Sequence, residues 1–473
     1  MLPIAIARDC QDISLGLALS RQYWILTEGA VLLEEILADE VTRTEAENQP
    51  MFRTDLDYDD LFLKRQEIAG SWVDLPTSEK QKYRTQLEYE RDHGAPDLND
   101  PEIIPAKNLS LIRKEVKARL DSHGAINILG LDALDFGESL VELAESVENI
   151  DDIREVYRIR KLATGSSKNS GISSKEALRI KNCFTQGREL FLAGRNGSLM
   201  VKPLNFFYSF TAYAYGIIIL NNPLRYRKDM LPGSHGMAYL PDSIKAQFGG
   251  DCARGTFSDL VTAFPTHLIK TENLEFSIDC TESLIEFYKQ RFDVSLGTLL
   301  SMVPEMSEYY KLTKGVHSRC FPLEIINAND PRSLIWEFHI GDGETRPPQE
   351  GIKEAFNDFD RSERHGKTVI TVPASRAHNI KACIYTDIRG DLWYVDNPFY
   401  PVILLEVAVH FLSSSIFSNI MRYRPDEWGN VLLNDVSPSI SLITRHYLSS
   451  FQRKLLVLVL RSVSRYLPYA ASD

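Results

Sequence analysis

A run of 18 uncharged residues, 203–220, is the feature that most limits how this chain can fold. A segment of this length can cross a membrane as a helix. However, it contains Asn205, Ser209, Thr211 and three tyrosines, whose polar groups are costly to place in lipid. We therefore predict that residues 203–220 form a helix in the core of a folded protein and not a membrane span.

The rest of the chain shows no pattern typical of a membrane or secreted protein. The apolar stretches 401–420 and 455–467 contain charged side chains, which argues against insertion into lipid. The first residues lack the cationic start and long apolar run of a signal peptide. The six cysteines are at least 28 positions apart, so they form no C-x-x-C or zinc pattern and suit a reducing compartment. We expect a cytoplasmic protein.

Charge is distributed unevenly along the chain. Residues 1–150 carry 30 acidic and 15 basic side chains, whereas the remaining 323 residues carry 35 acidic and 38 basic ones. The acidic first third would repel phosphate groups, which argues against nucleic-acid binding there. The excess of acidic side chains is compatible with a solvated helical surface or with an acidic docking arm.

A stretch rich in Gly and Ser, 164–174, is the best linker candidate in the sequence. It predicts an acidic helical N-terminal region at 1–163 and a second domain at 175–473. Ser173 and Glu176 have the spacing of a capping box, so we expect a helix to begin directly after the linker.

Between 315 and 396 the sequence becomes rich in β-branched and aromatic residues, which is typical of strands. The strand predictions are 321–327, 334–340, 368–372, 382–386 and 392–395, the last two forming a hairpin. Long helices are expected at 401–421 and 438–466, separated by a loop. The predicted fold class is α+β, predominantly helical, with a small antiparallel sheet inserted around 320–396.

Three segments together resemble the YaaC-like family of bacterial proteins. They are an aromatic-rich apolar stretch after a helix, a later His-Gly in a loop, and a helix ending in Arg-Tyr-x-Pro-x-x-Trp. The matching residues are Pro203, Tyr208, His235, Gly236, Arg422, Tyr423, Pro425 and Trp428. The resemblance covers roughly residues 175–470 and implies no particular reaction. It implies a bacterial cytosolic protein, and families of this kind often occur in antiviral defence systems. It also requires the 203–220 helix and the helix ending at Arg422 to share one compact body.

Two motifs are candidates for a binding or catalytic site. His235 stands beside Gly236 in a loop, where an imidazole could act as acid, base or ligand, or could merely fix the turn. The segment 422–428 combines Arg422, Tyr423, Arg424 and Trp428 just beyond a helix. Its arginines could bind phosphate or carboxylate, or could simply cap the helix, which Pro425 is expected to stop.

The C-terminal helix is a further binding candidate. Lys454, Arg461 and Arg465 fall on one side of a helical wheel, opposite an apolar face. Such a basic stripe could contact nucleic-acid phosphates, the acidic N-terminal third or a partner protein, or it could be an ordinary solvated face.

No P-loop, dinucleotide-binding, G-x-S-x-G or H-E-x-x-H motif occurs in the sequence, and we predict no cofactor and no metal. The first functional hypothesis is a non-catalytic interaction protein that binds a partner protein or nucleic acid, in a bacterial antiviral system. The alternative is an enzyme that hydrolyses a phosphodiester or nucleotide, with His235 as acid–base and Arg422 or Arg424 holding phosphate.

Overall fold

The computed structural model describes ten segments of the chain, and most of the acidic N-terminal region lies outside them. The described residues are 127–164, 171–223, 234–253, 255–264, 266–270, 275–281, 283–327, 335–435, 437–463 and 466–471. The chain divides into two compact units. Of the first unit (1–110 and 229–235), only Ser234 and His235 are described. Every helix and strand below belongs to the second unit (111–228 and 236–473).

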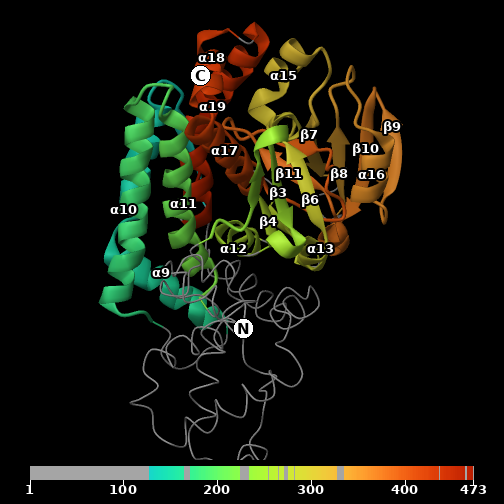
Figure 1. Cartoon of the computed structure of the whole chain (residues 1–473). Helices are drawn as coiled ribbons and strands as arrows, with labels where there is room; N and C mark the ends of the chain where they lie inside the picture. Colours follow the sequence, from blue (N-terminus) through green and yellow to red (C-terminus); the bar gives the residue numbers. More distant parts are fainter. Residues whose placement is uncertain are drawn as a thin grey trace, which may run out of the picture. The chain divides into compact units, whose positions relative to one another are not determined.

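Four long helices form the helical part of the second unit (Figure 1). They are α10 (Ser174–Asn196), α11 (Lys202–Asn221), α17 (Glu406–Tyr423) and α19 (Pro438–Val463). The predicted capping box is confirmed, because the Ser173 hydroxyl accepts from the Glu176 amide and the Glu176 carboxylate accepts from the Ser173 amide.

The apolar segment 203–220 forms α11, as predicted. By length and composition alone α11 could cross a membrane, but 78% of its most apolar window is buried inside the protein. Its aromatic side chains pack on neighbouring helices; the rings of Phe210 and Phe411 are 5.2 Å apart. Since Phe411 lies on α17, the aromatic segment and the helix ending at Arg422 share one compact body, as the family resemblance requires.

Glycines let α10 and α11 approach closely. A β-carbon at Gly187 would lie 2.7 Å from the ring of Tyr213, whose side chain is fully buried. Gly194 faces Phe206 in the same way about two turns further along, again with a closest distance of 2.7 Å. The pair therefore depends on the absence of side chains at these positions.

We expect Gly187→Ala to lower the free energy of unfolding by up to about 2 kcal/mol. Overpacking a core costs about 1–3 kcal/mol, which outweighs the roughly 1 kcal/mol that alanine gains over glycine within a helix. Gly429→Ala is the matched control, because Gly429 also lies in a helix and its β-carbon would meet nothing within 4 Å. This control should be neutral or stabilising in urea unfolding; equal effects of the two substitutions would contradict the close-packing argument.

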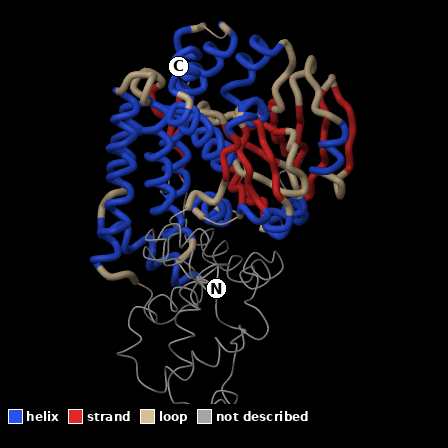
Figure 2. Tube along the Cα trace, viewed as in Figure 1, coloured by secondary structure: helices blue, strands red, loops and turns tan. Residues whose placement is uncertain are grey.

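A six-stranded antiparallel sheet stands beside the helices, in the order β11-β12-β7-β8-β10-β9 (Figure 2). Its strands are β7 (Cys320–Asn327), β8 (Ile335–Ile340), β9 (Asp360–Arg364), β10 (Lys367–Pro373), β11 (Cys383–Thr386) and β12 (Leu392–Val395). The predicted strands and the β11–β12 hairpin are thus confirmed, and β9 adds an edge strand whose residues are all exposed. The fold class, α+β and predominantly helical, is confirmed as well.

Three smaller sheets were not anticipated from the sequence. They are β2-β3-β6, β4-β5 and the parallel pair β1-β13. Their strands are β1 (Asn127–Asp132), β2 (Ala238–Leu240), β3 (Lys245–Gly249), β4 (Thr266–Lys270), β5 (Glu275–Asp279), β6 (Arg291–Ser295) and β13 (Tyr466–Ala471). The shorter α-helices are α8 (Phe136–Ser146), α9 (Ile150–Ala163), α12 (Thr256–Ala263), α13 (Ser283–Lys289), α14 (Leu296–Ser301), α15 (Ser307–Lys314), α16 (Gln349–Ala355) and α18 (Pro425–Leu433). The 3-10 helices among the described residues are η3 (Pro241–Ser243), η4 (Gly250–Cys252), η5 (Pro304–Met306) and η6 (Ala374–Asn379).

The predicted domain boundary at 164–174 needs correction. Helices α8 and α9 precede this stretch, yet they pack against α10, α11 and α19, which follow it. Arg188 on α10 holds the buried carboxylate of Glu148 at 2.7 Å, and Arg160 on α9 donates to Asn221 at the end of α11. The Gly/Ser-rich stretch therefore connects two helices of one unit and does not separate two domains.

Candidate functional site

The segment 422–428 forms a sharp corner between two helices. Helix α17 ends at Tyr423, and Arg424 leaves the helical conformation directly before Pro425, as the proline predicted. The residues after Pro425 were expected to form a loop, but they form α18. The backbone N–H groups in the first turn of a helix have no partner within the helix, so a proline there loses no hydrogen bond. Pro425 therefore ends α17 and also begins α18.

Two hydrogen bonds join this corner to α11 and to the turn that precedes it. Trp428 is 1% exposed and donates its indole N–H to the carbonyl of Met200 at 3.2 Å. Arg422 donates to the hydroxyl of Tyr208 on α11 at 3.3 Å. These two contacts join segments more than 200 positions apart, so the sequence-predicted residues Arg422 and Trp428 do come together around a fixed junction.

Both segments that meet at the junction have exposed side chains, which are apolar on one segment and aromatic and cationic on the other. Tyr423 is 62% exposed, and the Arg422 guanidinium lies 4.9 Å from the centre of its ring. Met200 and Val201 are 45% and 43% exposed. We refer to Met200, Val201, Arg422 and Tyr423 as the corner surface. We do not include Arg424 in the corner surface, because its guanidinium forms an ion pair with the Glu427 carboxylate at 3.0 Å.

His235, the predicted acid–base, is half-buried and belongs to the first unit. Arg422 and Arg424 belong to the second unit. The pairing of His235 with these arginines therefore stays a prediction.

The predicted basic stripe on the C-terminal helix needs correction. Lys454 is completely buried, because α19 is surrounded by protein on the side that the helical wheel assigned to solvent. Arg461 is half-buried and donates to the Thr386 carbonyl at 3.5 Å. Arg465 lies outside the described residues. The described part of α19 therefore does not present Lys454 and Arg461 to a phosphate backbone.

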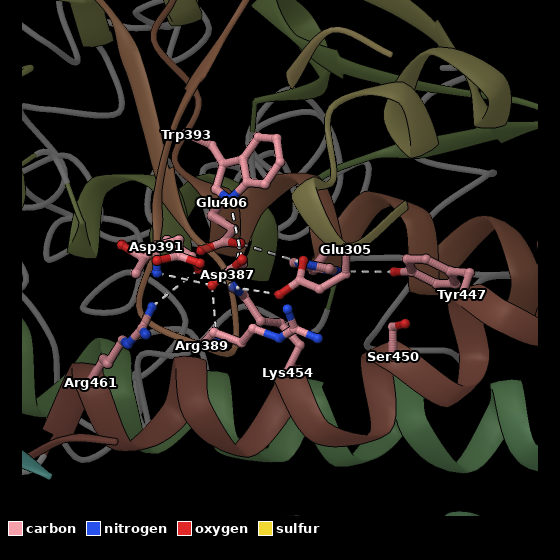
Figure 3. A network of polar contacts seen from close by, with 12 residues as sticks. Glu305, Asp387, Arg389, Asp391, Trp393, Glu406, Tyr447, Ser450, Lys454 and Arg461 are labelled. Carbon is pink, nitrogen blue, oxygen red and sulfur yellow. Dashed lines mark hydrogen bonds and ion pairs between the residues drawn. The ribbon is translucent and has the colours of Figure 1, made fainter. Parts of the chain in front are cut away.

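Lys454 is the centre of a buried cluster of charges (Figure 3). Its ammonium lies 2.6 Å from a carboxylate oxygen of Glu406 at the start of α17 and 3.0 Å from one of Glu305 in η5. It also donates to the Thr386 carbonyl at the end of β11. The carboxylates are themselves nearly inaccessible, with side-chain exposures of 9% and 7%. Four distant segments thus meet on one lysine.

His410 completes the cluster one helical turn after Glu406. Its Nε2 is 4.0 Å from the Glu406 carboxylate and makes no hydrogen bond, while Nδ1 lies 3.3 Å from the Tyr447 hydroxyl. Burial, with the charge of Lys454, holds the pKa of His410 well below its usual value, so the ring is neutral. Burial raises the pKa of Glu406 to about 7; Glu305 also raises it, whereas Lys454 opposes the shift.

A second group of polar contacts continues from the cluster to the turn of the β11–β12 hairpin (Figure 3). The buried carboxylate of Asp387 accepts from the Arg389 amide at 2.8 Å, the Asp391 amide at 3.0 Å and the Trp393 indole at 3.2 Å. Thr386 directly precedes Asp387, and its carbonyl accepts hydrogen bonds from Lys454 and Arg461. These bonds attach the hairpin turn to α19.

Glu305, Glu406 and His410 are not among the site residues predicted from the sequence. Glu406 and His410 stand four positions apart within an apolar stretch, and this was the available signal, because charged groups in such stretches are paired when buried. The ligand atoms of the three residues lie within 4.8 Å of one another, so they could hold a metal ion. The Lys454 ammonium already stands between the two carboxylates. With exposures of 0% and 1%, Lys454 and His410 cannot contact a dissolved substrate in this arrangement.

Comparison with known proteins identifies one family. The family model described as YaaC-like Protein matches residues 145–463. This range begins upstream of the resemblance seen in the sequence and includes α9, the corner surface and the charged cluster. No curated protein and no solved structure matches the chain.

Proposed function

Since the chain belongs to the YaaC-like protein family, we propose that it is a non-catalytic interaction protein of the bacterial cytoplasm that binds a partner protein through the corner surface. The observation that carries this proposal is the contrast between the two polar regions. The charged cluster is inaccessible, whereas the corner surface exposes an aromatic ring, a guanidinium and two apolar side chains beside the hydrogen bond from Trp428 to Met200.

The composition of the corner surface favours a protein over a nucleic acid as the partner. Tyrosine and arginine are the residue types that dominate binding energy at protein interfaces, and methionine adapts to apolar partners. Nucleic-acid binding would need several exposed cations, but Lys454 is buried and Arg424 is paired with Glu427. The expected partner segment therefore presents an apolar side chain next to a carboxylate. An antiviral defence system is the setting in which we propose to look for it.

Affinity purification from the native host tests this function. We expect Arg422→Glu with Tyr423→Ala to weaken binding of the co-purifying protein at least about tenfold, because these residues supply the aromatic and charged contacts. The matched control is Arg361→Glu with Leu312→Ala, which changes an exposed arginine on β9 and a 71% exposed leucine on α15. Binding should be measured with the purified pair by titration calorimetry.

Two results would contradict the proposal. Equal binding by the corner variant and the control variant would remove the corner surface as the interface. A phosphodiester or nucleotide hydrolysis activity lost in both His235→Ala and Arg422→Ala would instead support the enzymatic alternative.

A further inference from the structure

We propose that Glu305, Glu406 and His410, together with the Thr386 carbonyl, form a cation-binding site of the kind that holds a divalent transition metal, and that Lys454 is its built-in cation. The site lies where η5, β11, α17 and α19 meet (Figure 3). Its ligand class is a small divalent cation such as Zn²⁺, which should enter only when the lysine ammonium is removed.

The donor set carries the first part of the argument. The carboxylate oxygens and the imidazole nitrogen lie within 4.8 Å of one another, and Thr386 adds a carbonyl oxygen that faces the same ammonium. Imidazole and carboxylate are ligands that Zn²⁺ accepts, usually four to a metal. The ammonium contacts three of the four donor groups, so it occupies the position that a metal ion would take.

His410 supplies independent evidence that the cluster is built for a cation. It is 1% exposed, and its Nε2 faces Glu406 with no hydrogen bond. When Nδ1 donates its hydrogen to the Tyr447 hydroxyl, Nε2 carries a lone pair directed into the cluster. Metal-binding histidines are oriented in this way, by a hydrogen bond from the ring nitrogen that does not bind the metal.

The balance of charge explains why the lysine and a metal should exclude one another. When their carboxyl groups are ionised, Glu305, Glu406 and Asp387 carry three negative charges, and Lys454 and Arg461 carry two positive ones, so the lysine leaves the cluster close to neutral. Adding a divalent ion to this set would leave an uncompensated excess of positive charge in the core, which is strongly unfavourable. Replacing Lys454 removes one positive charge and opens space at the same place.

The test compares Zn²⁺ binding by the full-length chain and by Lys454→Ala. After gel filtration, elemental analysis should find one Zn²⁺ per chain in Lys454→Ala and none held at this site in the wild type. Lys454→Ala with His410→Ala should bind at least about tenfold more weakly. The matched control is Lys454→Ala with His339→Ala, which removes a histidine that pairs with Glu337 on β8 instead. Co²⁺ absorption should report the same pattern.

Stability supplies a second readout in case Lys454→Ala folds poorly. Zn²⁺ should raise the thermal unfolding temperature of Lys454→Ala and should not raise that of Lys454→Ala with His410→Ala, because a ligand that binds only the folded state stabilises it. The inference is overturned if Lys454→Ala neither binds nor is stabilised by Zn²⁺. Equal binding by both histidine double variants would also overturn it.

Discussion

Replacing Lys454 with methionine should lower the free energy of unfolding by about 3–5 kcal/mol, the cost typical of removing one partner from a buried ion pair. Methionine fills a similar volume, so the loss comes mainly from charge. Glu305 and Glu406 would remain in the core without the ammonium that now lies 3.0 Å and 2.6 Å from them. Urea unfolding of the full chain, followed by circular dichroism, measures the effect.

Two further variants isolate the cause of that loss. Arg453→Met changes the exposed neighbour on the same helix and should shift stability by no more than about 0.5 kcal/mol. Adding Glu305→Gln and Glu406→Gln to Lys454→Met should recover more than half of the loss, because a neutral cluster no longer leaves carboxylates unpaired. A loss below about 1 kcal/mol for Lys454→Met alone would show that the carboxylates do not depend on the lysine.

The cluster and the corner surface are linked by packed aromatic rings. His410 contacts the hydroxyl of Tyr447, whose ring stacks on Phe417 at 5.2 Å. Phe417 in turn lies edge-on to Trp428, with ring centres 6.2 Å apart. Trp428 is the residue that fixes the corner to Met200. Packed side chains therefore connect the charged cluster to the corner that carries the proposed binding surface.

Elements with strong local signals could be predicted from the sequence. The capping box at Ser173 and Glu176 identifies a helix start through contacts only three residues apart. The uncharged run 203–220 indicates a core helix, because a helix that is apolar on all sides is buried within a protein or a membrane, and its polar residues disfavour the membrane. The β11–β12 hairpin is likewise set by its own turn, in which Asp387 accepts hydrogen bonds from the backbone amides of two nearby residues.

Contacts between distant segments could not be predicted in this way. A helical wheel separates Lys454 from the apolar face of α19, but it cannot show that Glu305 and Glu406 approach from the other side. The same limit hid the β1–β13 pair, whose strands are more than 300 positions apart. At the corner, the sequence predicted that Pro425 ends α17. It did not predict that Trp428 contacts Met200.

The free energy of unfolding should depend on pH in a way that reflects the raised pKa of Glu406. Burial raises its pKa from an ordinary 4.5 to about 7, so between these values the unfolded chain ionises while the folded protein keeps the proton. The stability due to this group is present below pH 4.5 and is lost as the pH rises through 7. Relative to Glu406→Gln, the wild type should therefore lose roughly 3 kcal/mol from pH 4.5 to 7.

The comparison with Glu406→Gln is needed because His410 acts in the opposite direction. Its pKa is lowered by burial, so its contribution is present above pH 6.5 and is lost as the pH falls below that value. In the wild type the two effects oppose one another below pH 6.5, and Glu406→Gln should expose the histidine as a fall in stability on acidification. Glu350→Gln, at an exposed position in the first turn of α16, serves as the control. If urea unfolding gives parallel pH profiles for wild type and Glu406→Gln, Glu406 does not hold its proton in the folded state, and the charge balance around Lys454 must be assigned differently.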